Sequence, residues 1–167
     1  MTNNELLVGT WRLASYRLVG SRGRVRYPYG EDATGYILYG ADGYMAVSIM
    51  SAGRTSFAGA DILRRTTEEA AEATFTYLSY CCTYEVLPED PGALDMGRVL
   101  HHVEVSLFPN WTGTTQERFF RLDGDHLDLS TAPLHQENVP RACLTWERVR
   151  RQQEVSSLQS QAVGRVR

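Results

Sequence analysis

The sequence predicts a mainly β protein in which about eight to ten antiparallel strands close into a barrel, with one α-helix inserted near residues 66–79. Two observations predict this fold. Short runs with strand periodicity, separated by turn residues, recur along the chain, and only one segment has helical periodicity. The 167 residues suffice for one domain with its own core. We place that domain at residues 5–150 and expect a mobile polar tail at residues 151–167.

The strand candidates can be taken in chain order. Gly9–Val19 has the composition of a strand, and Gly23–Tyr27 has it more weakly. Tyr36–Tyr39 and Tyr44–Met50 flank a turn that contains Asp42-Gly43, where glycine allows a positive φ at low cost. The remaining candidates are Tyr80–Leu87, Arg98–Phe108, Thr114–Leu122, His126–Thr131 and Ala142–Val149, with Asp123–Asp125 as the turn of a second hairpin.

The single helix begins with a recognisable N-terminal signal. Thr66 and Glu69 have the spacing of a capping box, in which hydroxyl and carboxylate each bind a free backbone N–H group. The helical stripe that follows is expected to face a core, and it consists of Ala70, Ala73, Thr74, Tyr77 and Leu78. The preceding segment, Ser51–Asp61, is rich in small residues, and we interpret it as a loop over an opening of the barrel.

Strand alternation assigns one face of each strand to the barrel interior. In Arg98–Phe108 the apolar face is expected inside, and it carries Val99, His101, Val103, Val105 and Leu107. The same rule places a further set inside, made up of Cys82, Tyr84, Val86, Gln116, Arg118, Phe120, Leu122, Leu127, Leu129, Thr131, Leu144, Trp146 and Arg148. A packed core rarely holds Arg and Gln together, because each unpaired buried polar group costs roughly 1–3 kcal/mol. The pattern therefore favours a cavity that holds water or a ligand, although a β-bulge would reverse the faces of a strand.

Composition excludes several classes of protein. The net charge of −3 argues against nucleic-acid binding, and no apolar run is long enough to span a membrane. The first eight residues lack the features of a secretion signal, so we expect a cytoplasmic protein. All 17 basic residues are arginine, which excludes Schiff-base chemistry on lysine. Cys81, Cys82 and Cys143 are expected to be free thiols, and the spacing of Cys and His predicts neither a metal site nor a cofactor.

Several stretches of the sequence carry a family resemblance. Gly9-Thr10-Trp11 opens the first strand, and Trp146 and Arg148 lie on the last one. This arrangement resembles the lipocalin and calycin pattern, which implies that Trp11 packs across the barrel base against Arg148. Further stretches resemble the bacterial lipocalin-like domain family over nearly the whole domain, namely Tyr27–Gly30, Gly43–Met45, His101–Trp111 and Gly124–Ser130. Unlike classical lipocalins, this sequence has no signal peptide and carries its helix in mid-chain.

The resemblance implies a barrel around a hydrophobic cavity. Related cytosolic barrels of bacterial polyketide pathways include cofactor-free cyclases and pericyclases. The resemblance therefore implies a cofactor-free cyclase or isomerase that folds a polyene or polyketide-like molecule for a cycloaddition. The alternative is a non-catalytic carrier of a small hydrophobic molecule, and a third interpretation is an interaction domain whose barrel is filled by its own side chains.

The candidate site residues follow from the predicted interior. We expect His101 to act as a general acid or base, or else to be an interior histidine bonded to a tyrosine or to the backbone. Arg118 and Gln116, together with Tyr84, are expected to bind and polarise a carbonyl or enolate. The expected substrate contacts are Trp11, Ser15, Tyr36, Met45, Val103, Phe120 and Trp146. The expected partner is a small hydrophobic molecule, bound by a monomer or a small homo-oligomer.

Overall fold

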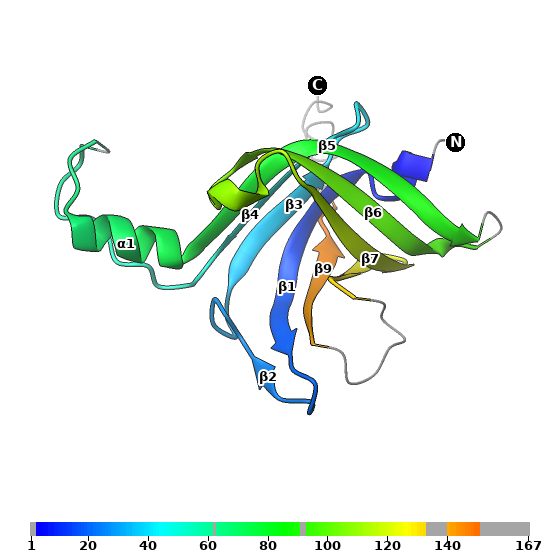
Figure 1. The fold of residues 1–167 in the computed structure, drawn as a ribbon, viewed down its shortest axis with the longest axis horizontal. Helices are drawn as coiled ribbons and strands as arrows, with labels where there is room; N and C mark the ends of the chain where they lie inside the picture. The colour runs from blue at the N-terminus through cyan, green and yellow to red at the C-terminus, as the bar shows by residue number, and fades with distance from the viewer. Residues whose placement is uncertain (1–2, 62, 91–92, 133–139, 151–167) are drawn as a thin grey trace, which may run out of the picture.

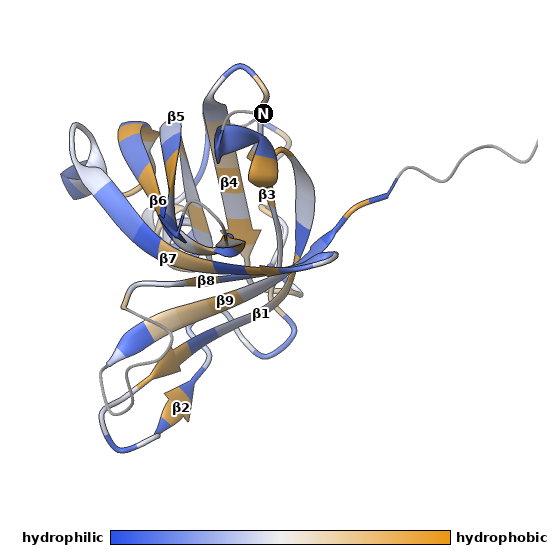
Figure 2. Ribbon diagram, turned by 90° about the vertical axis from the view of Figure 1, so that its right-hand side faces the viewer, coloured by the Kyte–Doolittle hydropathy of each residue, from blue (hydrophilic) through white to orange (hydrophobic). Residues whose placement is uncertain are grey.

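The computed structural model describes residues 3–61, 63–90, 93–132 and 140–150, so the predicted tail at 151–167 lies outside the described residues. Its strands alternate hydrophobic and hydrophilic residues, as a barrel with one buried face requires (Figure 2). The elements in chain order are η1 (Asn3–Leu6), β1 (Gly9–Val19), β2 (Val25–Arg26), β3 (Thr34–Tyr39), β4 (Tyr44–Met50), α1 (Thr67–Phe75), β5 (Tyr77–Asp90), β6 (Ala93–Ser106), η2 (Pro109–Trp111), β7 (Thr115–Asp123), β8 (His126–Ser130) and β9 (Arg141–Arg148).

The strands form one antiparallel sheet that closes on itself (Figure 1). Strands β3 to β9 pair in sequence order, and β1 pairs with β3 on one side and with β9 on the other. The two-residue strand β2 extends only the far end of β1. Closure leaves no long unpaired edge among these strands. The expected closed antiparallel barrel with one helix is thus confirmed.

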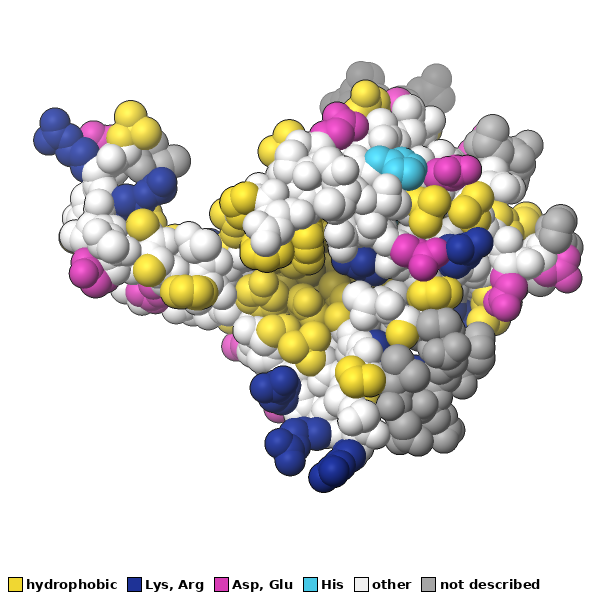
Figure 3. All heavy atoms as spheres, in the orientation of Figure 1, with side chains coloured by type: hydrophobic (Ala, Val, Ile, Leu, Met, Phe, Trp, Pro, Cys, Tyr) yellow, Lys and Arg dark blue, Asp and Glu magenta, His cyan; other side chains and the backbone are white. Residues whose placement is uncertain are grey.

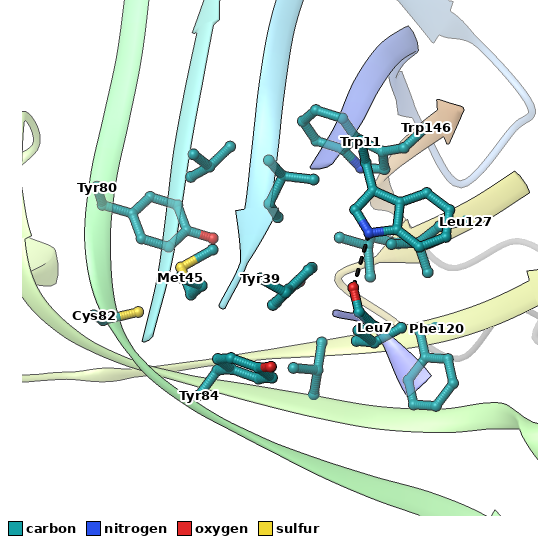
Figure 4. Close-up of a cluster of buried hydrophobic side chains, with 14 of the residues drawn as sticks. Leu7, Trp11, Tyr39, Met45, Tyr80, Cys82, Tyr84, Phe120, Leu127 and Trp146 are labelled. Atoms are coloured by element: carbon teal, nitrogen blue, oxygen red, sulfur yellow. Dashed lines mark hydrogen bonds between the residues drawn. The ribbon is translucent and has the colours of Figure 1, made fainter. Parts of the chain in front are cut away.

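One end of the barrel is sealed by the N-terminal segment. The indole N–H group of Trp11 donates a hydrogen bond to the carbonyl oxygen of Leu7 at 2.9 Å, and both residues are fully buried (Figure 4). The guanidinium carbon of Arg148 lies 3.9 Å from the centroid of the Trp11 ring, and its Nη1 donates to the Val8 carbonyl at 2.8 Å. A side chain at Gly9 would collide with this guanidinium, since a Cβ there would lie 2.7 Å from Nη1. The structure therefore brings Trp11 and Arg148 together at the closed base.

Two β-bulges change the faces that simple alternation predicts. In β1 the register shifts between Leu13 and Ser15, so Tyr16 lies opposite Leu144 and Ser15 lies opposite Thr145 on the outer face. The expected inward position of Ser15 is therefore wrong. In β6 the register shifts next to Val103, and Val105 is 64% exposed. The inward positions expected for Val105 and Leu107 are wrong for the same reason: each bulge inserts one residue and inverts the alternation beyond it.

The expected position of Tyr36 is also wrong. Its side chain is 47% exposed, and its neighbours Ile37 and Tyr39 are the residues of β3 that point into the core. The inward positions expected for Val99, His101 and Val103 are confirmed, since all three are buried.

Helix α1 is correctly located, but it does not pack as predicted. The capping box is confirmed: Thr66 Oγ1 accepts from the Glu69 N–H, and the Glu69 carboxylate accepts from the Thr66 N–H. No residue of the helix is buried, and α1 extends away from the barrel (Figure 1). The loop expected to cover an opening instead bonds along the helix, where Arg54 donates to the Ala73 carbonyl and the Ala58 N–H donates to Glu69. The stripe ends early because Tyr77 already begins β5.

Replacement of Arg148 by methionine should destabilise the barrel by about 2 kcal/mol. The variant keeps a long apolar stem but loses the cation–π contact with Trp11 and the charge-assisted hydrogen bond to the Val8 carbonyl. Urea unfolding measures the effect. The control is Arg12→Met, which removes an exposed ion pair with Glu147 and should cost less than about 1 kcal/mol. Equal losses in the two variants would contradict the role of Arg148 at the base.

Candidate functional site

A cavity opens at the end of the barrel away from Trp11. Its lining comes from the far ends of the strands, including Tyr16 of β1 and Ala142 of β9. The cavity has a volume of about 100 Å³ and is partly open to solvent. Figure 3 shows the mouth as a hollow floored by hydrophobic side chains, with basic atoms at its edge. The lining residues are Tyr16, Ile37, Val47, Ile49, Leu78, Tyr80, Trp111, Arg118, Leu129, Thr131, Ala142, Leu144 and Trp146.

Among the described residues, Arg118 is the one charged member of this lining. It lies on β7 with its side chain half-buried, and its Nη1 donates to the carbonyl oxygen of Glu117 at 2.7 Å. Its Nη2 lies 3.5 Å from Oε1 of Gln116, at the limit of a hydrogen bond. Within the described ranges no carboxylate forms an ion pair with Arg118. A guanidinium with free donors beside an apolar cavity is suited to bind an oxygen acceptor of a ligand.

A chain of three polar side chains crosses the interior. His101 is fully buried, and its Nε2 lies 2.9 Å from the hydroxyl of Tyr39 while its Nδ1 lies 2.8 Å from the hydroxyl of Tyr80. Burial, together with a smaller contribution from the positive charge of Arg118, lowers the pKa of His101 to about 3, so the imidazole is neutral at pH 7. Burial raises the pKa of Tyr80 to about 12 and that of Tyr39 well above its usual value. All three groups are therefore uncharged.

The indole of Trp146, on the same cavity wall, carries a buried hydrogen-bond donor without a described partner. Trp146 is fully buried and lines the cavity, yet its Nε1–H has no hydrogen-bond partner among the residues that the structure describes. A buried donor without an acceptor costs roughly 1–3 kcal/mol. An acceptor atom of a bound molecule would remove that cost.

The structure separates the predicted site residues into three groups. Arg118 and Trp146 line the cavity, and Gln116 lies beside Arg118 without lining it. Ser15 and Tyr36 are on the outer face. The others are buried in the core and do not line the open cavity, namely Trp11, Met45, Tyr84, His101, Val103 and Phe120.

Tyr84 illustrates why a buried polar residue need not belong to the site. Its hydroxyl donates to the carbonyl of Gly40 at 2.9 Å, and its own backbone carbonyl accepts from the side chain of Asn4 in the N-terminal segment that seals the base. These contacts hold the closed end together. The expectation that Tyr84 polarises a ligand carbonyl has no support from its position.

Several lining residues are absent from the predicted set of substrate contacts. Tyr16 faces the cavity only because of the bulge after Leu13, which alternation does not reveal. Tyr80 precedes Cys82 and Tyr84 on the same inward face of β5. Extending the predicted alternation by two residues toward the start of the strand would have included it. Trp111 lies in the short helix η2 and packs edge-on against Tyr80 with ring centroids 5.6 Å apart.

Comparisons with known proteins agree with the fold. The profile of a lipocalin-like domain family matches residues 8–149. The 4'-hydroxy-3'-methoxypropiophenone carrier protein ppsC of Aspergillus oryzae is 38% identical over 109 residues, which cover 64% of this chain and 98% of that relative. No solved structure matches the chain. None of the described helices is long and apolar enough to cross a membrane.

The similarity to a carrier corrects the main functional expectation. The cofactor-free cyclase or isomerase is contradicted, because the matching relative is named for carrying a small molecule. The similarity to this carrier favours the alternative interpretation, a non-catalytic carrier of a hydrophobic ligand. The position of His101 agrees with this correction, since both of its ring nitrogens already contact tyrosine hydroxyls.

The buried neutral histidine should make the barrel sensitive to acid. The folded-state pKa of His101 is about 3, below the 6.5 of an ordinary histidine, so between these values only the unfolded chain binds the proton. The free energy of unfolding should therefore fall as the pH drops through this window, by up to about 1.4 kcal/mol per pH unit.

Urea unfolding at pH 7, 6 and 5 tests this expectation. The decrease in the free energy of unfolding below pH 6.5 should be larger in the wild type than in His101→Gln, because glutamine cannot bind the proton. His102→Gln is the matched control, because the neighbouring ring is half-buried on the outer face, and its loss should equal that of the wild type. An unchanged pH slope in His101→Gln would show that other groups cause the acid sensitivity.

Proposed function

The chain belongs to the lipocalin-like domain family, and from that premise we propose that it binds a small, largely apolar molecule in the open cavity of its barrel and carries it without converting it. The observation that carries the proposal is the chemistry of the cavity wall. Apolar side chains supply nearly all of it, and Arg118 adds one cation that has no described carboxylate partner. Such a wall combines a hydrophobic contact surface with a polar group that orients the ligand.

The size of the cavity limits the ligand. The cavity volume of about 100 Å³ is far below the roughly 300–1,000 Å³ of sites that enclose drug-sized molecules. A molecule with one ring fits this description, with its ring inside the barrel and its remaining atoms in the mouth. The aromatic side chains of Tyr80, Trp111 and Trp146 provide surfaces for ring contact.

The polar groups near the cavity support carriage over catalysis. General acid–base catalysis needs a group whose pKa lies near the working pH and which reaches the substrate. His101 has a pKa of about 3 and is enclosed between two tyrosines, and the pKa of Tyr80 is about 12. Neither group is suited to exchange a proton with a ligand at neutral pH.

The similar carrier from Aspergillus oryzae suggests a first probe. The compound in its name, 4'-hydroxy-3'-methoxypropiophenone, has one aromatic ring, a ketone and a short alkyl group. We take it as the test ligand for this chain because its ring suits the enclosed volume and its oxygens suit the donors of the wall.

Isothermal titration with this propiophenone should detect binding that depends on the cavity. Ala142→Phe places a ring in the cavity and should weaken binding at least tenfold. Arg118→Gln removes the charged donor and should weaken binding about tenfold, the value of one hydrogen bond to a charged group. Mass spectrometry of the recovered ligand should show it unchanged after long incubation.

Each variant has a matched control on the outer face. Ala46→Phe adds the same ring to an exposed position of β4, and Arg121→Gln removes an arginine of β7 whose partner is Asp128 on the surface. Both controls should bind like the wild type. Equal weakening by Ala142→Phe and Ala46→Phe would contradict the location of the site, and a new product would contradict carriage.

A further inference from the structure

The buried chain of Tyr39, His101 and Tyr80 holds more mobile protons than the hydrogen bonds within it can use. At neutral pH the chain of Tyr39, His101 and Tyr80 holds three mobile protons, one on each phenol and one on the imidazole. Only two hydrogen bonds join the three groups. One proton is therefore left without a partner inside the chain, and its position depends on which histidine nitrogen is protonated.

Tyr39 decides between the two arrangements. Its side chain is 2% exposed, and the Nε2 atom of His101 is the one hydrogen-bond partner of its hydroxyl among the described residues. If Nε2 carried the proton, it would donate to Tyr39, and the phenol proton of Tyr39 would be buried with no acceptor. That arrangement costs roughly 1–3 kcal/mol. The hydroxyl of Tyr39 therefore donates to Nε2, and the imidazole proton is on Nδ1.

The remaining proton is then on Tyr80. With its proton on Nδ1, His101 donates to the hydroxyl oxygen of Tyr80 at 2.8 Å, so the O–H of Tyr80 is free to donate elsewhere. Tyr80 lines the cavity, and in Figure 4 its ring extends from β5 with the hydroxyl toward the barrel interior. The spare proton is thus located where a bound molecule can accept it. A hydroxyl that accepts one hydrogen bond is also polarised into a better donor for the next.

Trp146 independently indicates the same kind of ligand atom. Its buried Nε1–H lines the same cavity and lacks a partner among the described residues. Together with Arg118, the cavity wall therefore presents three side chains with hydrogen-bond donors to spare. Such a wall favours a ligand that presents acceptor oxygens and disfavours the same carbon skeleton without them.

We propose that Tyr80 is a specificity-determining hydrogen-bond donor of the cavity, and that Tyr39 and His101 hold it in that role by fixing the histidine tautomer. The ligand class is a small aromatic molecule with a carbonyl-type acceptor oxygen. This inference rests on the proposed carrier function. Tyr39 is a positioning residue, because it acts through His101 and does not line the cavity.

A matched pair of ligands tests the proposal. 4'-Hydroxy-3'-methoxypropiophenone and 2-methoxy-4-propylphenol share the ring, the methoxy group and the three-carbon chain, and they differ only in the ketone oxygen. The wild type should bind the ketone about tenfold more tightly than the propylphenol, which corresponds to one well-formed hydrogen bond. Tyr80→Phe should reduce this preference to near one and Tyr39→Phe should reduce it in part, with the affinity for the propylphenol little changed in both variants.

Tyr77→Phe is the control variant. Tyr77 is on the same strand as Tyr80, and its hydroxyl donates to Ser48 outside the histidine chain. Its removal should leave the tenfold preference intact. If Tyr77→Phe lowers the preference as much as Tyr39→Phe does, the effect comes from loss of any buried hydroxyl and the proposal is overturned. Retention of the full preference in Tyr80→Phe overturns it directly.

Nitrogen NMR of the imidazole separates this proposal from the carrier function. The ligand-free wild type should show a neutral His101 with the proton on Nδ1, and Tyr39→Phe, which removes the hydroxyl that favours this tautomer, should show a mixture of the Nδ1 and Nε2 forms. A proton on Nε2 in the wild type would overturn the donor assignment. If neither compound binds while the tautomer is as expected, the carrier function fails for this ligand class and the donor assignment stands.

Discussion

The pairing of β1 with β9 is the constraint on which the remaining structure depends. It closes the sheet into a barrel and places Trp11 opposite Arg148 at one end of the two strands. The guanidinium covers the indole face, and the N-terminal segment supplies the carbonyl oxygens of Leu7 and Val8 that satisfy both side chains. The same strand pair runs from this closed base to Tyr16 and Ala142 at the other end of the barrel. No described residue seals that end, and the cavity lies there. One sealed end and one open end thus follow from a single strand pair.

Buried His101 also helps to hold the barrel together. A neutral imidazole in an apolar barrel needs a partner for each nitrogen, and tyrosines from β3 and β5 supply them. The three side chains therefore tie β6 to its neighbour β5 and, across the interior, to β3. This crosslink gives the barrel wall a fixed polar pattern while leaving it uncharged. A cavity wall of this kind orients a ligand through hydrogen-bond direction, and Arg118 contributes the single charge.

The sequence allowed the strands, their hairpins and the helix cap to be predicted because each depends on local signals. The capping box of Thr66 and Glu69 and the Asp-Gly turn of the first hairpin need only a few neighbouring residues. The inward faces could be predicted up to the first bulge in a strand and not beyond it, as Val103 and Val105 show. Bulges result from how two strands fit together, so alternation within one strand does not reveal them.

The candidate site could be predicted only in part for the same reason. Arg118 and Trp146 were found because their strands have no register shift within the barrel, whereas Tyr16 depends on the shift in β1. The packing of α1 could not be predicted either. Its stripe of Ala70 and Ala73 has the spacing of a buried face, but both side chains are small and the helix extends from the barrel. Periodicity states which face would be buried, and it does not state whether another element is there to cover it.

The free energy of binding expected for this cavity agrees with a protein that releases its ligand. Burying about 150 Å² of a single aromatic ring contributes roughly 4 kcal/mol. Each hydrogen bond to Tyr80 or Trp146 adds about 1 kcal/mol, and the contact with Arg118 adds slightly more. Loss of translational and rotational freedom offsets much of this gain. The balance holds a one-ring ligand only moderately, and the cavity is open to solvent among the residues that the structure describes. A carrier has to release its ligand, and a partly open apolar cavity with oriented donors combines selection of the ligand with moderate affinity.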